Sequence, residues 1–342
     1  MNEFSSKQVL FVAKHEQAKE IFTHLVNNFK TKKIDLDYLP ENFLLKIIGV
    51  ECKNKFLKFV ASIILQPIIN NKIKSYDSVV VCPGGFIRDI YIGLSLKHEK
   101  KVFILQSGFQ YQFKNIQNLN TKLPDKIITY RKHLFSQSNK IKYLVHGKFY
   151  KEILINNSIE PDNIVVVGSP RIKKIKNSFD NNSCIVYLCS SYKYEKLERE
   201  ELIEKKHLQY LNKLDENQFN IIIKPHPRGQ SVESLKKEFP NLKIKYFDMK
   251  EIIKFADIVI SNQSTANFES IFYGIPSYFV DEDSNLKFLN DSVKINYKKL
   301  FSDDLNSIII NKEAINKVQK DIAKKYIAHI GLESANKIYN CL

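Results

Sequence analysis

Short apolar runs alternate with amphipathic stretches along the whole chain, and this alternation limits the possible folds more than any other feature. Residues 78–82 are apolar and strand-like, residues 86–96 have helical spacing, and 102–106 are again strand-like. The same order returns beyond residue 184. Strands that alternate with helices form parallel sheets covered on both faces. The sequence therefore predicts an α/β fold.

The chain of 342 residues is too long for one ordinary core, and two domains of about 150 residues each are expected. A polar, basic stretch without apolar periodicity interrupts the alternation at 171–182. We predict a Rossmann-like domain over 1–170, a linker over 171–182 and a second Rossmann-like domain over 183–320. Closing helices over 321–342 can pack back on the first domain.

Two polar loops follow predicted strands in the C-terminal half, where open parallel sheets bind their ligands. The first loop contains His226 between Pro225 and Pro227, which restrict the backbone and present the imidazole from a stiff turn. A histidine in this position can donate a hydrogen bond to a phosphate oxygen, and Arg228 adds a second potential donor. The alternative is a structural histidine that satisfies a loop carbonyl.

The second loop opens a predicted helix with Ser264 and Thr265. Hydroxyl residues at this place are ordinary helix caps, but a helix N-terminus is also an anion site. A capping box with Thr265 would need an acid at position 268, which is Phe268. Glu269 comes one residue too late for that local role, so we expect it to accept hydrogen bonds from ligand hydroxyls. The two loops together predict a phosphate site.

These loops, followed by Gly-Ile-Pro at 274–276, resemble the C-terminal half of GT-B glycosyltransferases of bacterial surface polysaccharide (capsule and lipopolysaccharide) synthesis. The similarity is greatest to polysialyltransferases, Kdo transferases and CDP-glycerol glycerophosphotransferases. It covers residues 140–342, with further matches at 165–171 and 331–338, whereas the N-terminal third matches only in pattern. The resemblance implies two Rossmann-like domains that face each other across a cleft, with acceptor binding in the N-terminal domain and nucleotide-sugar binding in the C-terminal domain.

The resemblance also implies roles for individual residues. His226 would bind the phosphate and help the nucleotide to leave, Ser264 and Thr265 would bind the phosphate, and Glu269 would bind the ribose hydroxyls. The predicted donor-binding set is Gly168, Ser169, Pro170, Lys224, His226, Pro227, Arg228, Ser264, Thr265 and Glu269.

The acceptor side is predicted from the loops after two N-terminal strands. Several members of the resembled group carry a His-Gly pair after the strand that corresponds to 102–106, whereas this chain has Gln106-Ser107-Gly108. Ser107 stands where the base is expected, so that base is missing. Glycosyl transfer needs a base for the acceptor hydroxyl, and Asp89 is the best-placed carboxylate, with His98 and His133 as further candidates. The alternative for Asp89 is a first-turn acid that favours the helix dipole. The predicted acceptor-side residues are Gly84, Gly85, Gln106, Ser107 and Gly108.

Neither a metal nor another cofactor is expected. Residues 281–283 and 35–37 both have the spacing of a metal-binding Asp-x-Asp motif, but such spacings are common by chance.

The function expected from the resemblance is transfer of a CMP-activated acidic sugar (sialic acid, another nonulosonic acid or Kdo) to a bacterial cell-surface glycan. The alternatives are a transferase of the same fold that uses a CDP-polyol or a UDP-sugar, a sugar epimerase of the same architecture, and a non-catalytic basic protein that binds polyanions.

The formal net charge of +16 predicts an anionic partner, although heavy use of lysine can also reflect compositional drift. No nucleic-acid recognition motif accompanies the charge, so we favour peripheral contact with an anionic membrane over nucleic acid. The five cysteines form no CxxC pair, the N-terminus has no signal-peptide pattern, and the apolar segment 56–69 is too short to span a bilayer. These features predict a cytoplasmic protein, either in solution or at the inner face of the membrane.

Overall fold

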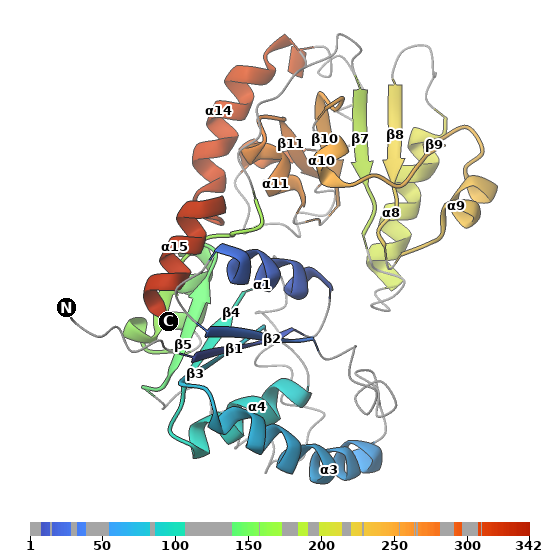
Figure 1. The fold of residues 1–342 in the computed structure, drawn as a ribbon. Coiled ribbons are helices and arrows are strands. Elements are labelled where there is room, and N and C mark those ends of the chain that lie inside the picture. The colour runs from blue at the N-terminus through green and yellow to red at the C-terminus, as the bar shows by residue number, and fades with distance from the viewer. Residues whose placement is uncertain are drawn as a thin grey trace. The chain divides into compact units, whose positions relative to one another are not determined.

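The structure is a computed structural model, and it divides the chain into two compact units. The first unit comprises Met1–Lys173 and Lys325–Leu342, and the second comprises Lys174–Lys324. Each unit is described by itself (Figure 1). The structure describes residues 8–13, 16–28, 33–38, 55–82, 86–106, 139–156, 158–172, 184–190, 198–213, 220–227, 229–252, 254–262, 264, 266–280, 291–295, 307–308 and 310–342.

The first unit is built on a sheet of six parallel strands in the order β2-β1-β3-β4-β5-β6. The strands β1, β3 and β4 are apolar and largely buried, as expected for a parallel sheet covered by helices. The six strands are β1 (Gln8–Ala13), β2 (Lys33–Tyr38), β3 (Ser78–Val81), β4 (Lys101–Leu105), β5 (Ile141–Val145) and β6 (Ile164–Val166).

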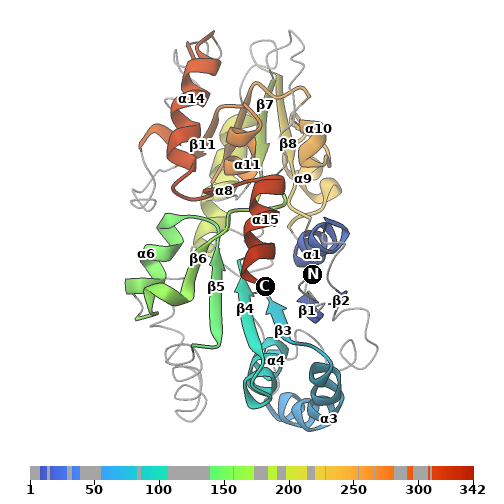
Figure 2. The ribbon, with the colours of Figure 1, turned by 60° about the vertical axis from the view of Figure 1, so that its left-hand side comes forward.

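Helices cover both faces of this sheet (Figure 1). Ile21 and Phe22 of one helix and Ala335 and Ile338 of another pack into the same core against the sheet. Figure 2 shows the last helix, in red, beside β4 and β5. The helices are α1 (Glu16–Asn28), α3 (Lys55–Lys74), α4 (Phe86–Lys97), α6 (Lys148–Asn156) and α15 (Gly331–Cys341), with a 3-10 turn, η4 (Pro161–Asn163).

The chain returns to the first unit through a close contact between two backbone segments. Gly168 has φ of +81°, and a Cβ at this position would lie 2.0 Å from the carbonyl oxygen of His329. The N–H of Ser169 donates to that same oxygen over 2.8 Å, and the N–H of Gly331 donates to the carbonyl of Ser169 over 3.2 Å. Only glycine combines this backbone conformation with this approach. Gly168 and Ser169 thereby fix where α15 begins.

The second unit contains a sheet of six parallel strands in the order β12-β11-β10-β7-β8-β9. The strands are β7 (Cys184–Leu188), β8 (Asn220–Lys224), β9 (Lys243–Ile244), β10 (Ile258–Ser261), β11 (Ser277–Val280) and β12 (Lys294–Ile295). The helical segments are α8 (Glu198–Leu211), α9 (Val232–Glu238), α10 (Met249–Ile252), α11 (Ala266–Phe272), η5 (Asp291–Val293) and α14 (Lys312–Ala323).

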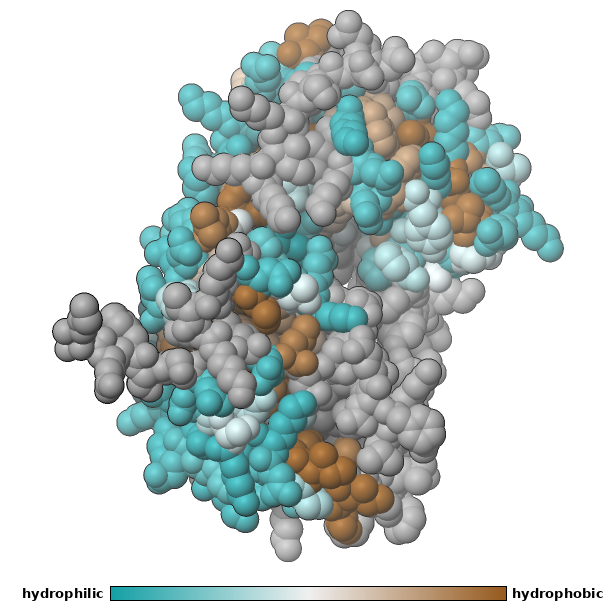
Figure 3. All heavy atoms as spheres, viewed as in Figure 1, coloured by the Kyte–Doolittle hydropathy of each residue, from teal (hydrophilic) through white to brown (hydrophobic). Residues whose placement is uncertain are grey.

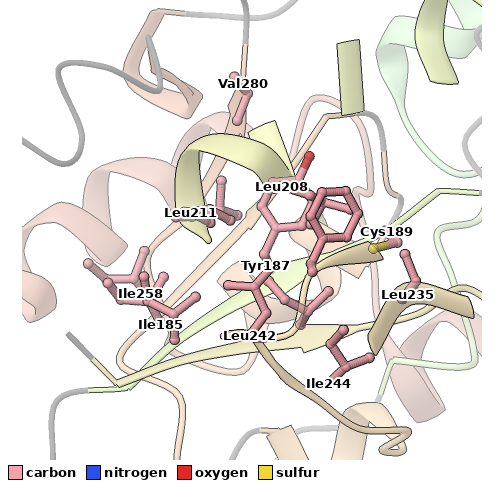
Figure 4. Packing of buried hydrophobic residues seen from close by; sticks show 14 of the residues in the cluster. Ile185, Tyr187, Cys189, Leu208, Leu211, Leu235, Leu242, Ile244, Ile258 and Val280 are labelled. Carbon is pink, nitrogen blue, oxygen red and sulfur yellow. The ribbon is translucent and has the colours of Figure 1, made fainter. Parts of the chain in front are cut away.

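The two faces of this second sheet are covered by different helices. Leu208 of α8 and Leu235 of α9 pack in one cluster with Ile185 and Tyr187 of β7 (Figure 4). Phe268 of α11 instead contacts Phe279 of β11, with ring centroids 5.0 Å apart. Successive residues of a strand point to opposite faces, and Tyr278 belongs to the first cluster while Phe279 meets α11. Helices α8 and α9 therefore lie on one face and α11 on the other.

The two units divide between Lys173 and Lys174 and again between Lys324 and Lys325. The division between Lys173 and Lys174 falls inside the predicted linker 171–182, and α15 belongs to the first unit. Most of the linker lies outside the described residues. Within the described part of the chain, no helix has the length and apolar character needed to cross a membrane. The largest apolar area in the view of Figure 3 lies over α3, where Ile63, Ile64 and Ile68 are exposed.

The contact at Gly168 predicts the effect of adding a single methyl group. Gly168→Ala should lower the free energy of unfolding by more than about 1–2 kcal/mol, the usual cost of a left-handed conformation, because the methyl group would also overlap His329. The same substitution in the interior of α4, Gly93→Ala, should leave stability unchanged or raise it. Urea unfolding of both variants tests this prediction, and equal stability of the two variants would contradict it.

Candidate functional site

The strand order of the second unit brings three loops to one edge of its sheet. β7 pairs with β10 on one side and with β8 on the other, and all these pairs are parallel. The loops that follow the three strands therefore leave from the same, carboxyl edge. They begin at Cys189, Pro225 and Asn262. In open parallel sheets this edge is where ligands bind.

His226 stands in a tight turn directly after β8. Pro225 is buried, His226 is half-buried and Pro227 is exposed. The N–H of Gly229 donates to the carbonyl of His226 over 2.8 Å and closes the turn. A Cβ on Gly229 would lie 3.2 Å from the carbonyl oxygen of Ser190 and 3.3 Å from Cβ of His226. The loops after β7 and β8 are thus in direct contact, and His226 is held at their junction.

Lys224 ends β8 beside this turn, and its carbonyl accepts the N–H of Cys189 over 2.9 Å. Burial lowers the pKa of Lys224, while Cys189 and Asp248 nearby act in the opposite direction. Lys224 is half-buried and lies two residues before His226. Arg228, the other basic residue predicted here, lies outside the described residues.

The loop after β10 carries the second predicted group. The N–H of Ser264 donates to Oγ of Ser261 over 3.0 Å, and Oγ of Ser264 accepts the N–H of Ala266 over 3.3 Å. Ser264 therefore has a capping role at the start of α11, and its own hydroxyl proton can still be donated to a ligand. Thr265 lies outside the described residues. With seven residues, α11 is a short helix.

Glu269 is buried in the structure. It is only 4% exposed, and it belongs to a helix in which every residue after Ala266 is buried. The expected contact of Glu269 with ligand hydroxyls stays a prediction. The pattern indicated that Glu269 does not cap the helix, but it could not indicate how much of this short helix would be covered.

A pocket with a volume of about 60 Å³ opens beside His226, on the face of the sheet covered by α8 and α9. Glu204 of α8 lines it, and the carboxylate Oε1 of Glu204 accepts the N–H of Ser190 over 2.8 Å. Cys189 and Leu235 also line the pocket, and they lie at the same end of the apolar cluster between the sheet and helices α8 and α9 (Figure 4). The pocket is therefore formed by α8, α9 and the same two loops that hold His226.

Burial changes the protonation of two groups in this pocket. It raises the pKa of Glu204 to about 8, although the hydrogen bond from the Ser190 N–H acts in the opposite direction. It also raises the pKa of the Cys189 thiol well above its usual value, and the nearby Glu204 acts in the same direction. At neutral pH both groups are uncharged, so Cys189 is not a reactive thiolate.

The carboxyl edge of the first sheet is partly described. Oε1 of Gln106, after β4, accepts the N–H of His146, after β5, over 2.8 Å. His146 is 3% exposed, and burial lowers its pKa to about 3. Gln106 thus ties two strand ends together. Gly84, Gly85, Ser107 and Gly108 lie outside the described residues, and Asp89 lies in α4 with a side chain outside the described part.

Gly168, Ser169 and Pro170 follow β6 and are all buried. Their backbone conformation and hydrogen bonds are explained by the contact with His329 and Gly331 within the first unit. Their expected place beside a nucleotide stays a prediction.

Sequence reasoning missed Ser190 and Glu204, which line the pocket with His226, and Asn262, which lies two strands away at the same sheet edge. Asn262 directly follows β10, is 5% exposed, and its Nδ2 has no hydrogen-bond partner among the described residues. Such an amide is a suitable donor for a phosphate oxygen. Ser190 and Asn262 could have been found as polar residues at strand ends. Glu204 has no such signal, because it lies within a charged helix.

The arrangement can bind an anion and a neutral polar group side by side. His226, Lys224, Ser264 and Asn262 offer hydrogen-bond donors or positive charge, and Glu204 offers an uncharged carboxyl group. Among the described residues, no cluster of three histidine, cysteine or acidic side chains could hold a metal ion. Residues 281–283 lie outside the described part of the chain.

Comparisons with known proteins identify the fold. No family model and no curated protein matches the chain by sequence. Among solved structures, the UDP-GlcNAc 2-epimerase of Neisseria meningitidis matches with a TM-score of 0.58 at 13% identity, covering 98% of this chain and 99% of that one. The UDP-GlcNAc 2-epimerase of Methanocaldococcus jannaschii matches with a TM-score of 0.56 at 12% identity and the same coverage. MurG of Acinetobacter baumannii matches with a TM-score of 0.51 at 17% identity, covering 98% of each chain.

These similarities extend over almost the whole chain, and they show a GT-B-type fold with two Rossmann-like domains. The predicted fold class is confirmed. The resemblance to the polysialyltransferase and Kdo transferase group in particular stays a prediction.

The protonation of Glu204 predicts a pH dependence of stability. Its pKa is raised from 4.5 to about 8 on folding, so the folded protein holds a proton that the unfolded chain releases. The free energy of unfolding should therefore fall as pH rises from about 4.5 to about 8, and level off above that. Glu204→Gln does not carry this titrating proton. The Tm of Glu204→Gln minus the Tm of the unmodified protein should therefore increase as pH rises through that range.

Thermal unfolding at a series of pH values measures this difference. Gln209→Ala, on the exposed side of the same helix, should keep the profile of the unmodified protein. A difference between Glu204→Gln and the unmodified protein that is constant with pH would contradict the protonated state of Glu204.

Proposed function

We propose that this protein is a nucleotide-sugar-dependent GT-B enzyme that transfers a sugar to a glycan acceptor, with the nucleotide phosphate bound next to His226. The observation that carries the proposal is the His226 turn, held against the loop after β7 at the carboxyl edge of the second sheet. The similar solved structures support it, because they are UDP-GlcNAc 2-epimerases and MurG.

The chemistry follows from where negative charge develops. When a glycosyl bond to a nucleotide breaks, the leaving phosphate gains charge, and hydrogen-bond donors placed there in advance stabilise it. His226 donates from its ring, while Asn262 and the hydroxyl of Ser264 lie two strands away at the same edge. Lys224 adds positive charge. Asp89 stays the proposed base for the acceptor hydroxyl, and the expectation that no metal or other cofactor is needed stays a prediction.

The nucleotide and the sugar are the finer part of the proposal. The sequence resemblance favours a CMP-activated acidic sugar, whereas the similar structures favour a UDP-sugar. Donors such as His226 and Ser264 bind a phosphate and carry no preference for either base. We therefore propose CMP-linked and UDP-linked sugars as the two donor classes to be distinguished, with a CDP-polyol as a third.

Epimerisation is the second candidate function, and one observation favours it. The epimerase structures match this chain with TM-scores of 0.58 and 0.56, above the TM-score of 0.51 for MurG. An epimerase would turn over a nucleotide sugar without any acceptor. A transferase would need a glycan and would release the nucleotide in equal amount to the sugar transferred.

The proposed location is the cytoplasm, in solution or at the inner face of the membrane. A net charge of +16 and the exposed isoleucines of α3 support contact with an anionic bilayer. No nucleic-acid partner is proposed.

Nucleotide-induced stabilisation tests the substrate class. We expect Tm to rise with CMP, CDP or UDP at millimolar concentration, by an amount that identifies the base, because a ligand that binds only the folded state stabilises it. Inorganic pyrophosphate should give a smaller rise. Binding to heparin that weakens with salt, with no stabilisation by any nucleotide, would instead favour a non-catalytic polyanion-binding protein.

Replacement of His226 tests its role in the departure of the nucleotide. His226→Ala should lower kcat about a hundred-fold, the usual cost of losing one positioned donor, with little change in Tm. His226→Gln keeps a donor and should retain more activity. Lys236→Ala, on the exposed side of α9, serves as the control. A folded His226→Ala variant with unchanged kcat would overturn the assignment.

A further inference from the structure

The pocket beside His226 differs in charge from the anion-binding groups around it. Glu201 and Glu204 of α8 and Glu238 of α9 line it. Its one lysine, Lys205, forms an ion pair with Glu238. Beside the uncharged Glu204, two further acidic side chains and one paired lysine make a poor place for a phosphate. The group that enters this pocket is therefore not the anionic part of a ligand.

The size of the pocket limits the ligand further. A volume of about 60 Å³ gives room for a few water-sized groups, and a nucleobase or a sugar ring is larger. A hydroxyl or hydroxymethyl group that projects from a ring would fit. His226 lines the same pocket, so a ligand with its phosphate at His226 could place such a group here.

Glu204 has the hydrogen-bonding capacity that such a group needs. Its Oε1 is oriented by the N–H of Ser190, which fixes the carboxyl group at the wall of the pocket. A protonated carboxyl group both donates and accepts, as a hydroxyl group does. The side chain is half-buried, so it is shielded from bulk water and can still be reached from the pocket.

We propose that this pocket binds an uncharged hydroxyl-bearing group of the nucleotide sugar, and that Glu204 is the residue that binds it. The inference rests on the proposed function and assigns a second contact to the same ligand. The hydroxyl group belongs either to the ribose of the nucleotide or to the transferred sugar. The two sources share their chemistry and are separated by the ligand used in the test.

Other titratable groups surround Glu204, and a pH experiment needs a variant that keeps all of them. They are Cys189 after β7, Glu201 and Lys205 on α8, His226 after β8 and Glu238 on α9. Glu204→Gln leaves all of them in place and removes only the titration of Glu204. Comparing Glu204→Gln with the unmodified protein therefore isolates the contribution of Glu204 to the pH dependence of binding.

The experiment measures the Kd of three ligands by calorimetry: pyrophosphate, the nucleotide identified by thermal shift, and the corresponding nucleotide sugar. Glu204→Ala should weaken nucleotide-sugar binding about ten-fold, because it removes a buried hydrogen-bonding partner, and should leave pyrophosphate binding unchanged. A loss already present for the nucleotide places the hydroxyl in the ribose, and a loss only for the nucleotide sugar places it in the sugar. Gln209→Ala should bind all three ligands as the unmodified protein does.

The pH profile separates binding from a merely structural role. Above about pH 8 the ionised Glu204 can no longer donate, so nucleotide-sugar affinity should fall several-fold in the unmodified protein and stay constant in Glu204→Gln. Equal affinity of Glu204→Ala and the unmodified protein, or identical pH profiles with and without Glu204, would overturn this inference alone. Failure of the unmodified protein to bind any nucleotide would overturn the proposed function together with it.

Discussion

The position of β7 between β8 and β10 is the constraint on which the second unit depends. Parallel pairing on both sides of β7 forces three loops to leave from one edge of the sheet. Gly229 then lets the loop after β8 approach the carbonyl of Ser190, because any side chain there would crowd both Ser190 and His226. A histidine between two prolines would be unremarkable elsewhere. Here it is fixed beside a pocket, with donors from a third strand at the same edge.

A comparable constraint acts in the first unit, although it concerns the path of the chain. Gly168 and Ser169 contact the backbone around His329, and α15 then packs on the same core as α1. The Gly-Ser-Pro segment after β6 therefore has a structural reason for its sequence. A nucleotide contact at this segment would add to that reason and is not needed to explain it.

The sequence was sufficient for the fold because strand and helix patterns are local. The apolar runs at 184–188 and 258–260 are strands, and the parallel sheets follow from their alternation with helices. The resemblance to GT-B enzymes predicted the two-domain architecture. The two epimerases and MurG share this fold although their sequences are 17% identical or less to this chain.

The site was less predictable because its geometry depends on packing between segments distant in sequence. The burial of Glu269 follows from how α11 is covered, which no spacing reveals. Glu204 lies in a helix rich in charged residues, and only its contact with Ser190 distinguishes it from its neighbours. His146 resembles an ordinary strand-end histidine until its contact with Gln106 is known.

A crystal structure of the protein with a bound nucleotide tests the role of His226 most directly. We predict a phosphate oxygen within about 3 Å of a ring nitrogen of His226, at the carboxyl edge of β7, β8 and β10. A nucleotide whose phosphates lie away from His226, with the imidazole in contact only with protein atoms, would contradict it.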